Sequence, residues 1–377
     1  MNILLIIPEN TGTIASVSFN LYKSLVKHPN LKVCVACLGP YRNSGFQFEN
    51  VYKLYRNNLA GKIVARVFTL RKIKHNFAID LSISTLLGAT YWNVLSGIGE
   101  KKVGVFHTCL SQQRKKGWAI YWINYILDKL LCSRLDRMIA VNKSAYLDLK
   151  HLHRHSANID LAYNIHDFAK INDFSTESIS DKDEREIFKN PVILYVGGLF
   201  HNIKGTDRLI KAFAETKARH NSCNLVFIGA DQDESLPFLK HICHSLNVEK
   251  QVYFLGRKNN PYKYMKRSEI LVSPSRDEGL PGVLIEALSL GLRCVATNSS
   301  MGVWEIMQCE DKYDANLNHL VDTRFGIICP NDLENENFTI SQLAKAIDRC
   351  LQKEYFSLEE FDKSRFEEDT ITLHYVS

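Results

Sequence analysis

The sequence predicts an α/β protein built from two Rossmann-like domains, and three observations favour this architecture. A chain of 377 residues is too long for one ordinary hydrophobic core. Two separate stretches, starting at Ile3 and at Val192, each run from an apolar strand through a glycine-containing loop into a helix. Between them lies a polar, charged stretch that has little to bury. We therefore expect an N-terminal domain (residues 1–168), a linker (169–190), a C-terminal domain (191–355) and a final segment (356–377).

The composition is that of a soluble globular chain, with 45% hydrophobic and 23% charged residues. No run reaches the roughly 20 apolar residues that a membrane span requires. The segment from Met1 to Pro8 reads as a first strand, because it lacks the basic start and the cleavage site of a signal peptide. Among ten cysteines only Cys34 and Cys37 form a CxxC pair, with no second pair to complete a zinc site. We expect Cys34 and Cys37 to be buried as small hydrophobic side chains. We also expect the protein to be reduced and cytoplasmic.

The net charge of +6 conceals a strong asymmetry along the chain. Up to Ile165 there are 22 basic and 8 acidic residues, a net charge of +14, whereas the remainder carries −8. Basic and aromatic residues cluster at 62–75 and at 114–125, as in helices that bind anionic membranes. The alternative to membrane binding is a solvated helix whose aromatic side chains pack in the core. No motif in the sequence supports nucleic-acid binding. We expect membrane contact at a set of five residues: Arg114, Lys115, Lys116, Trp118 and Trp122.

The first domain opens with a strand at Ile3–Ile7 and a helix at Ile14–Val26, and further strands are predicted at 32–38, 78–84 and 103–107. The first loop is not GxGxxG, which weakens a dinucleotide oxidoreductase interpretation. Gly12 in that loop permits close approach of a ligand, although a simple turn glycine fits equally well. His107 ends the last of these strands, where such folds place ligands. A structural histidine remains the alternative.

In the second half, the stretch Ser273–Leu288 combines a strand end, a glycine-rich turn and a helix that starts near Pro281. Glu278 precedes the helix and Glu286 lies within it, off its apolar stripe. A helix start binds phosphate through its free N–H groups, and two carboxylates can bind hydroxyls. This combination predicts a sugar-nucleotide site.

Two other polar groups of the second half follow predicted strands. Lys204 stands before Gly205 at a helix entrance and can present an ammonium to a phosphate, although a surface lysine is the common alternative. The spacing is not that of a Walker loop. Asp231 and Asp233 imitate a metal-binding DxD motif, but solvated loop acids explain them as well. We expect no metal and no cofactor, with the nucleotide sugar acting as substrate.

These residues resemble the retaining GT-B glycosyltransferases of group 1, which include many bacterial lipopolysaccharide, O-antigen and capsule enzymes. The resemblance is dense from Val192 to Met307 and thinner over the first half. Its most specific element is the E-x7-E signature, here Glu278 to Glu286. It implies two Rossmann-like domains facing across a cleft, with the acceptor on the first and the donor on the second. It also implies that the closing helix packs back on the N-terminal domain.

The resemblance assigns roles to individual positions. Glu278, His107 and Lys204 would be the catalytic set, with Glu278 on the transferred sugar and Lys204 on the diphosphate. Glu286 would take the ribose hydroxyls. The other donor-binding positions would be Gly12, Gly198, Gly256, Arg257, Gly279, Leu280, Gly282 and Val283. Gly198 stands where family members often carry arginine, so Lys204 would bear more charge, and Arg257 or Arg276 could compensate.

The implied reaction moves a hexose or N-acetylhexosamine, with retention and without metal, from a UDP-sugar to a glycan or lipid-linked acceptor. Front-side attack suits retention in the absence of an obvious carboxylate nucleophile. Such a protein would work in bacterial surface polysaccharide synthesis, in the cytoplasm at the inner face of an anionic cytoplasmic membrane. Two alternatives remain: a non-transferring enzyme of the same fold, such as a nucleotide-sugar 2-epimerase, and a non-catalytic sugar-nucleotide or membrane-surface binding protein.

Overall fold

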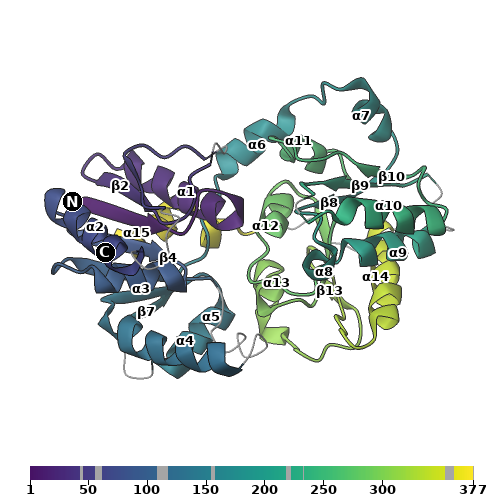
Figure 1. The fold of residues 1–377 in the computed structure, drawn as a ribbon. Helices are drawn as coiled ribbons and strands as arrows, with labels where there is room; N and C mark the ends of the chain where they lie inside the picture. The colour runs from purple at the N-terminus through teal and green to yellow at the C-terminus, as the bar shows by residue number, and fades with distance from the viewer. Residues whose placement is uncertain are drawn as a thin grey trace. The chain divides into compact units, whose positions relative to one another are not determined.

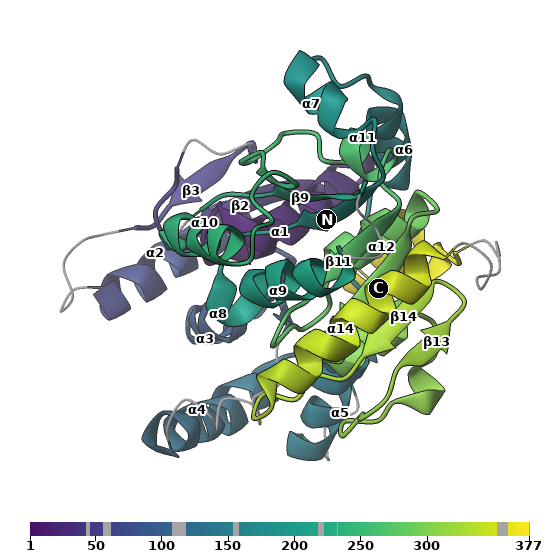
Figure 2. The ribbon, with the colours of Figure 1, turned by 90° about the vertical axis from the view of Figure 1, so that its right-hand side faces the viewer.

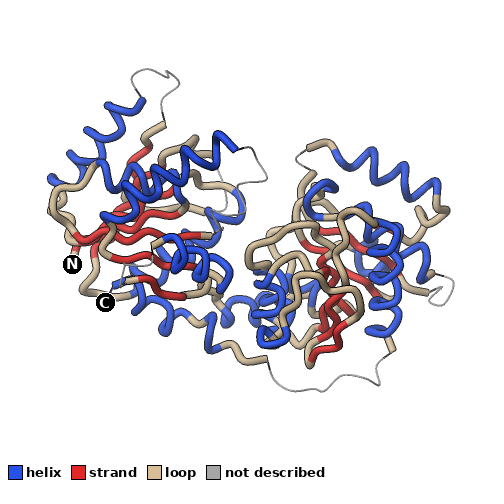
Figure 3. The backbone as a smooth tube through the Cα atoms, turned by 90° about the horizontal axis from the view of Figure 1, so that it is seen from below, coloured by secondary structure: helices blue, strands red, loops and turns tan. Residues whose placement is uncertain are grey.

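The computed structural model describes residues 1–42, 46–55, 62–107, 118–153, 158–217, 222–231, 233–352 and 361–376. The chain divides into two compact units, which are coloured along the chain in Figure 1. Unit 1 comprises Met1–Asp167 with Ser364–Ser377, and unit 2 comprises Phe168–Lys363. Each unit is a central sheet, drawn red in Figure 3, with helices packed around it. The predicted pair of Rossmann-like domains is therefore present.

Unit 1 contains a parallel sheet with the strand order β3-β2-β1-β4-β5-β6-β7. Its strands are β1 (Asn2–Ile7), β2 (Lys32–Cys37), β3 (Val51–Lys53), β4 (Leu81–Thr85), β5 (Lys101–Phe106), β6 (Arg137–Ala140) and β7 (Ile159–Leu161). Its helices are α1 (Gly12–Lys27), α2 (Lys62–Asn76), α3 (Leu87–Leu95), α4 (Trp118–Leu131), α5 (Lys143–Leu152) and α15 (Glu368–Val376). Short 3-10 turns lie at Cys132–Arg134 and Ser364–Phe366.

The β1 strand of unit 1 is apolar throughout because a parallel sheet is covered on both faces. Residues Ile3–Ile7 are all fully buried. Leu4 and Ile6 pack with Leu70 of α2 and Ala89 of α3 on one face. Cys34 and Cys37 are buried free thiols in β2 whose pKa values burial raises to about 11. They behave as the small hydrophobes that the sequence predicts.

Unit 2 has the strand order β10-β9-β8-β11-β12-β14-β13, parallel except for the antiparallel pair β13–β14. Its strands are β8 (Val192–Val196), β9 (Asn224–Ile228), β10 (Val252–Phe254), β11 (Ile270–Ser273), β12 (Arg293–Thr297), β13 (Val321–Thr323) and β14 (Gly326–Cys329). Its helices are α6 (Phe168–Thr176), α7 (Lys182–Ile187), α8 (His201–Lys204), α9 (Thr206–Thr216), α10 (Ser235–Ser245), α11 (Tyr262–Met265), α12 (Gly282–Ser289), α13 (Met301–Ile306) and α14 (Glu336–Leu351), with a 3-10 turn at Glu310–Lys312. Helices α9 and α14 lie side by side (Figure 2).

The predicted linker at 169–190 is wrong, because this segment belongs to unit 2 and contains α6 and α7. Helix α6 packs against α11. Glu184 of α7 accepts hydrogen bonds from Tyr264 (2.6 Å) and Lys258 (2.5 Å). Polar contacts and a few buried apolar residues, Ile171 and Ile179 among them, hold these short helices, although the segment's polar composition predicts a linker.

The closing helix α15 belongs to unit 1. Thr372 and Ser24 of α1 share a buried hydrogen bond, and Lys27 pairs with Glu368 at 2.5 Å. Arg137 donates to the carbonyl of His374 at 2.7 Å. The end of the chain is thus fastened to the first helix and to β6 of the N-terminal sheet.

Candidate active site

The candidate site of unit 2 lies where its strand order changes direction. The chain runs from β8 outward to β9 and β10, then returns to place β11 on the other side of β8. The loops after β8 and β11 therefore diverge from adjacent strand ends, and such a point is where open α/β sheets bind ligands. The sequence-predicted residues Lys204 and Glu278 lie in these two loops.

Lys204 and Glu278 are in direct contact although they are 74 residues apart in the sequence. The Lys204 Nζ atom lies 2.6 Å from Glu278 Oε1. The hydroxyl of Ser275, which is buried, donates to the same oxygen at 2.8 Å. A cation and an oriented carboxylate therefore share one small site.

Glycines allow the two loops to approach closely. Gly205, which ends α8, has a φ of +64°, and an added Cβ would lie 2.1 Å from the carbonyl oxygen of Pro274. Gly198 accepts a 2.7 Å hydrogen bond from the Tyr195 hydroxyl, and an added Cβ would lie 2.5 Å from the Phe200 ring. An arginine at position 198 would require this ring to move. The pKa of Tyr195 is raised by burial and by the nearby charge of Glu278, so its hydroxyl stays protonated as a donor.

Helix α12 begins at Gly282, and its N-cap residue, Pro281, gives the first turn no side-chain hydrogen bond. The N–H groups of Gly282 and Val283 lie in this first turn, at the positive end of the helix dipole. The preceding loop contains Gly279 and Leu280, and Ser300 fixes it by donating to the Gly279 carbonyl at 3.0 Å. The turn that the sequence predicts to bind an anion therefore leads directly into the first turn of a helix.

Glu286 lies half-buried in α12, one helical turn inside that start. Burial raises its pKa to about 7, and a 3.4 Å hydrogen bond from the Tyr262 hydroxyl opposes this rise only partly. Glu286 therefore changes its charge near neutral pH. The contact between Tyr262 and Glu286 could not be predicted from local sequence spacing, because the two residues are 24 positions apart.

We expect Glu286→Gln to stabilise the protein more at pH 8 than at pH 5. The unfolded carboxyl ionises near pH 4.5 and the folded one near 7, so wild-type stability falls as pH rises between these values. The glutamine variant avoids this loss of roughly 1 to 3 kcal/mol, since each pKa unit corresponds to about 1.4 kcal/mol. Melting temperatures of both proteins from pH 5 to 8 measure the effect. A difference that does not grow with pH would contradict it.

The two arginines considered as phosphate partners are placed differently. Arg257 follows Gly256 in the loop after β10, where both are exposed. Gly256 has a φ of +68°, and its carbonyl accepts from the N–H of Gly229 at 3.0 Å. Arg276 is bound to carboxylates: Asp207 at 2.9 and 3.1 Å and Glu336 at 3.0 Å. Arg276 is therefore already paired with carboxylates, and its compensating role at the phosphate stays a prediction.

Gly12 and His107 belong to unit 1 and follow β1 and β5 at the carboxyl edge of its sheet. Gly12 starts α1 with a φ of +78° and open space where a Cβ would lie. His107 is buried, and its Nε2 atom has no hydrogen-bond partner among the described residues. Burial lowers the pKa of His107 to about 4, so the ring is neutral at pH 7. The neutral ring presents an unused polar atom at this edge.

The two acids of the DxD-like segment are occupied at the start of α10. Asp231 accepts from the N–H groups of Ser235 (2.8 Å) and Leu236 (3.2 Å), and Asp233 accepts from the Ser235 hydroxyl (2.6 Å). These bonds satisfy the helix N-terminus. Among the described residues, no cluster of three or more His, Cys, Asp or Glu side chains is arranged to hold a metal ion.

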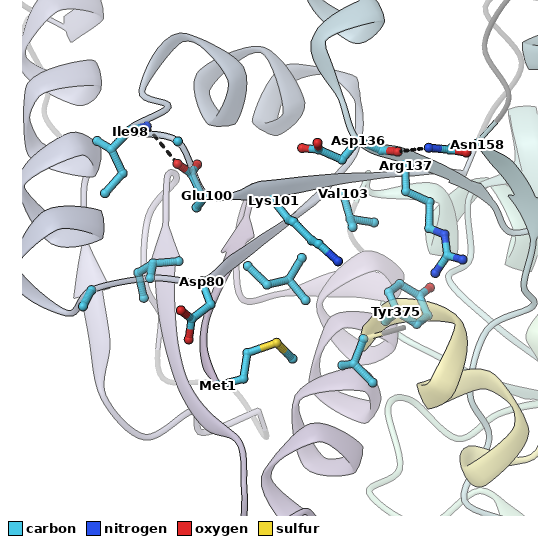
Figure 4. Close-up of a pocket in the computed structure, with 15 residues that line it drawn as sticks. Met1, Asp80, Ile98, Glu100, Lys101, Val103, Asp136, Arg137, Asn158 and Tyr375 are labelled. Atoms are coloured by element: carbon cyan, nitrogen blue, oxygen red, sulfur yellow. Dashed lines mark hydrogen bonds between the residues drawn. The ribbon is translucent and has the colours of Figure 1, made fainter.

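A cavity of about 840 Å³ lies at the opposite, amino edge of the unit 1 sheet (Figure 4). Several of its polar groups have protein partners. Asp80 accepts from the N–H of Asn2 at 2.7 Å, Asp136 accepts from the N–H of Lys102 at 2.8 Å, and Arg137 pairs with Asp160 at 2.8 Å. Parallel sheets bind ligands at the other edge. We therefore interpret the cavity as a gap between the sheet and α15.

The predicted membrane segment is described only in part. Arg114, Lys115 and Lys116 lie outside the described residues, as does the side chain of Trp118, the first residue of α4. Trp122 is 46% exposed, and four further apolar residues of α4 are between 36% and 59% exposed: Ile123, Ile126, Leu127 and Leu130. No helix in the described ranges has the length and apolarity to cross a bilayer.

Comparison with known proteins finds a family match within the second unit. Residues 177–312, which include both loops of the candidate site, match the family model described as glycosyl transferases group 1. An uncharacterized glycosyltransferase of Methanocaldococcus jannaschii is 30% identical over 165 residues, which is 44% of this chain and 40% of that protein. The chain thus matches less than half of the length of this relative.

A longer match is to the N-acetylgalactosamine-N,N'-diacetylbacillosaminyl-diphospho-undecaprenol 4-alpha-N-acetylgalactosaminyltransferase of Campylobacter jejuni. It is 29% identical over 274 residues, covering 71% of this chain and 67% of that protein. Among solved structures, Anabaena HepE in complex with UDP-glucose superposes with a TM-score of 0.70 and 17% identity, covering 100% of this chain and 98% of that one. The chain therefore has the GT-B fold.

Proposed function

We propose that this GT-B chain, in which residues 177–312 form a group 1 glycosyltransferase domain, is a retaining glycosyltransferase that uses a nucleotide sugar. The observation that carries the proposal is the Lys204–Glu278 pair, which lies where the strand order of unit 2 changes direction. This pair lies in the loops that the group 1 family model covers. It combines a cation for a diphosphate with a carboxylate for sugar hydroxyls, as a nucleotide-sugar site requires.

In the proposed reaction, the bond between the anomeric carbon and the diphosphate oxygen breaks while the acceptor hydroxyl attacks from the same face. The bonding pair stays with the diphosphate, and the hydroxyl proton passes to the departing phosphate oxygen. Lys204 and the N–H groups of Gly282 and Val283 stabilise the leaving anion without a metal ion. Glu278 holds sugar hydroxyls, Glu286 binds the ribose, and the loop at Gly256 and Arg257 contacts the base.

The donor and acceptor classes rest on the relatives. HepE is a fold neighbour with UDP-glucose bound, which favours a UDP-sugar as donor. The Campylobacter relative is named for an undecaprenol-diphosphate-linked acceptor, which favours a lipid-linked glycan here. We accordingly place the protein in bacterial surface polysaccharide synthesis, on the cytoplasmic side of the membrane. Gly12 and His107, at the carboxyl edge of the unit 1 sheet, are further proposed substrate-binding residues.

An assay with and without acceptor tests the activity. The purified chain is incubated with UDP-, GDP- and ADP-sugars, alone or with undecaprenyl-diphosphate-linked and lipooligosaccharide acceptors, and products are identified by mass spectrometry and NMR. We expect a product only when both substrates are present, with the donor's anomeric configuration retained. An altered sugar formed from the donor alone would indicate an epimerase. Nucleotide binding without any product would indicate a binding protein.

We also propose that α4 rests on the anionic membrane that carries the acceptor. Its exposed apolar residues recur at helical spacing along one face, and burying them in a bilayer interface removes apolar surface from water. Lys129 lies on the same helix, and the first half of the chain is strongly basic. Basic residues beside an apolar helix face complement anionic lipid headgroups.

Replacing Ile123, Ile126 and Leu130 together with serine should reduce binding to phosphatidylglycerol vesicles by at least about tenfold. Each buried apolar side chain contributes about 1.5 kcal/mol or more. Co-sedimentation with phosphatidylglycerol and with phosphatidylcholine vesicles measures the effect. The matched control replaces Leu147 and Leu373, which are similarly exposed on α5 and α15, with serine. Equal vesicle binding by wild type and the α4 variant would refute this surface.

A further inference from the structure

Lys204 is carried by a helix that cannot be stable by itself. Helix α8 contains only the four residues from His201 to Lys204, and no side chain caps its start at Phe200. One helical turn fixes many backbone dihedrals for few hydrogen bonds, so it forms only where neighbouring groups hold it. The position of the Lys204 ammonium therefore depends on contacts from elsewhere in unit 2.

Arg276 provides those contacts from the loop that contains Glu278. Its backbone N–H donates to the carbonyl of Ile203 at 2.8 Å, and its guanidinium Nη1 donates to the carbonyl of His201 at 2.5 Å. Two carbonyls of the single turn of α8 are thus fixed by one residue. That residue stands two positions before Glu278.

The guanidinium of Arg276 is itself held in place. Asp207 of α9 binds it through both carboxylate oxygens, and Glu336 at the start of α14 binds its Nε atom. The Asn331 side chain donates to the Arg276 carbonyl at 2.9 Å. Although burial alone would raise the pKa of Asp207, the Arg276 guanidinium keeps it below its usual value, so the pair stays charged. A rigid bidentate arginine can fix geometry in a way that a flexible lysine cannot.

We propose that Arg276 is a positioning residue that holds α8 so that Lys204 faces the diphosphate of the nucleotide. This inference rests on the proposed function, because it assumes that Lys204 meets a diphosphate. Arg276 acts through Lys204, and its own charge is matched by Asp207 and Glu336. Its loss should therefore weaken recognition of the diphosphate and leave recognition of the nucleoside unchanged.

Arg208 offers a matched control within the same network. It is fully buried and bonds the same Glu336 carboxylate at 2.5 and 2.7 Å, together with Asn331 at 2.7 Å. Its side-chain hydrogen bonds go to these two residues, whereas those of Arg276 also reach α8. Arg208→Lys should therefore lower the melting temperature without a selective effect on the diphosphate.

The test compares calorimetric affinities for UDP and uridine, GDP and guanosine, and ADP and adenosine, using the full chain. We expect Arg276→Lys to weaken binding of the preferred diphosphate about tenfold, which corresponds to about 1.4 kcal/mol, with the nucleoside affinity unchanged. Asp207→Asn, which retains Arg276 but loosens it, should show a smaller selective loss. In a Lys204→Ala background, Arg276→Lys should cause no additional loss, because the residue that it positions is absent.

Equal losses for nucleoside and diphosphate would overturn the inference, and so would a full additional loss in the Lys204→Ala background. A selective loss in Arg208→Lys as large as in Arg276→Lys would also overturn it, since the network would then act only through stability. If the wild-type protein binds none of the diphosphates, the proposed function fails and the inference fails with it. Failure of the proposed function is distinguishable from failure of the positioning role, because it is seen with the wild-type protein before any variant is made.

Discussion

Lys204→Ala is expected to lower kcat/KM for sugar transfer about 100- to 1000-fold and to weaken binding of the nucleoside diphosphate. The substitution removes the cation of the pair and leaves the Glu278 carboxylate without its partner at 2.6 Å. An uncompensated negative charge beside a diphosphate adds repulsion to the lost attraction. Initial rates and calorimetric titration with UDP measure the two effects.

The control for Lys204 is Lys217→Ala, in which the lysine follows α9 and donates to the Asn247 carbonyl at 2.8 Å. Because α9 starts beside the site and runs away from it, Lys217 lies at the other end of the helix. Activity and UDP affinity of this variant should match those of the wild type. A Lys204→Ala enzyme with unchanged UDP affinity would remove Lys204 from the phosphate site.

Glu278→Gln is expected to separate chemistry from nucleotide binding. The carboxylate accepts bonds from Lys204 and Ser275, and its charge is available to sugar hydroxyls. A hydrogen bond to a charged group contributes about 1.5 to 3 kcal/mol, so kcat should fall roughly 10- to 100-fold. UDP affinity should be retained or increase, because a negative charge near the diphosphate is removed. Turnover assays and titration with UDP distinguish this pattern from that of Lys204→Ala.

The neighbouring Asp277 supplies the control, since it is an exposed acid in the same loop. Asp277→Asn should leave kcat and UDP affinity unchanged. Unchanged turnover in Glu278→Gln would refute the assignment of this carboxylate to the transferred sugar.

The sequence predicted the local units of the site well, because each is encoded by neighbouring residues. The turn before α12 follows from an apolar strand, a glycine-rich loop and Pro281 in order. Local patterns place Lys204 at a helix entrance and Glu278 before a helix start, and the family resemblance implies a site role for Lys204. Their direct contact could not be derived from spacing, since it results from the adjacency of β8 and β11 in the sheet.

Contacts that depend on distant partners explain the errors. The sequence suggests Arg276 as a compensating cation but cannot show that it pairs with Asp207 and Glu336, which are 69 and 60 residues away. The segment that forms α6 and α7 is predicted to be a linker because the partners that stabilise it lie far along the chain. Ser275 stands three residues before Glu278, and that spacing was the only local signal for its role.

The exposed face of α4 could not be read from the sequence alone. The apolar pattern around Trp122 is compatible with packing in the core as well as with a surface. Helical periodicity identifies an apolar face but not its partner, and only the three-dimensional structure shows which side chains remain exposed.

We propose that the diphosphate of a nucleotide sugar binds between Lys204 and the start of α12. A crystal structure of the full chain with UDP tests it most directly. We expect phosphate oxygens within hydrogen-bond distance of Lys204 Nζ and of the N–H groups of Gly282 and Val283, with the ribose near Glu286. A diphosphate bound elsewhere, for example in the cavity at the amino edge of unit 1, would contradict it.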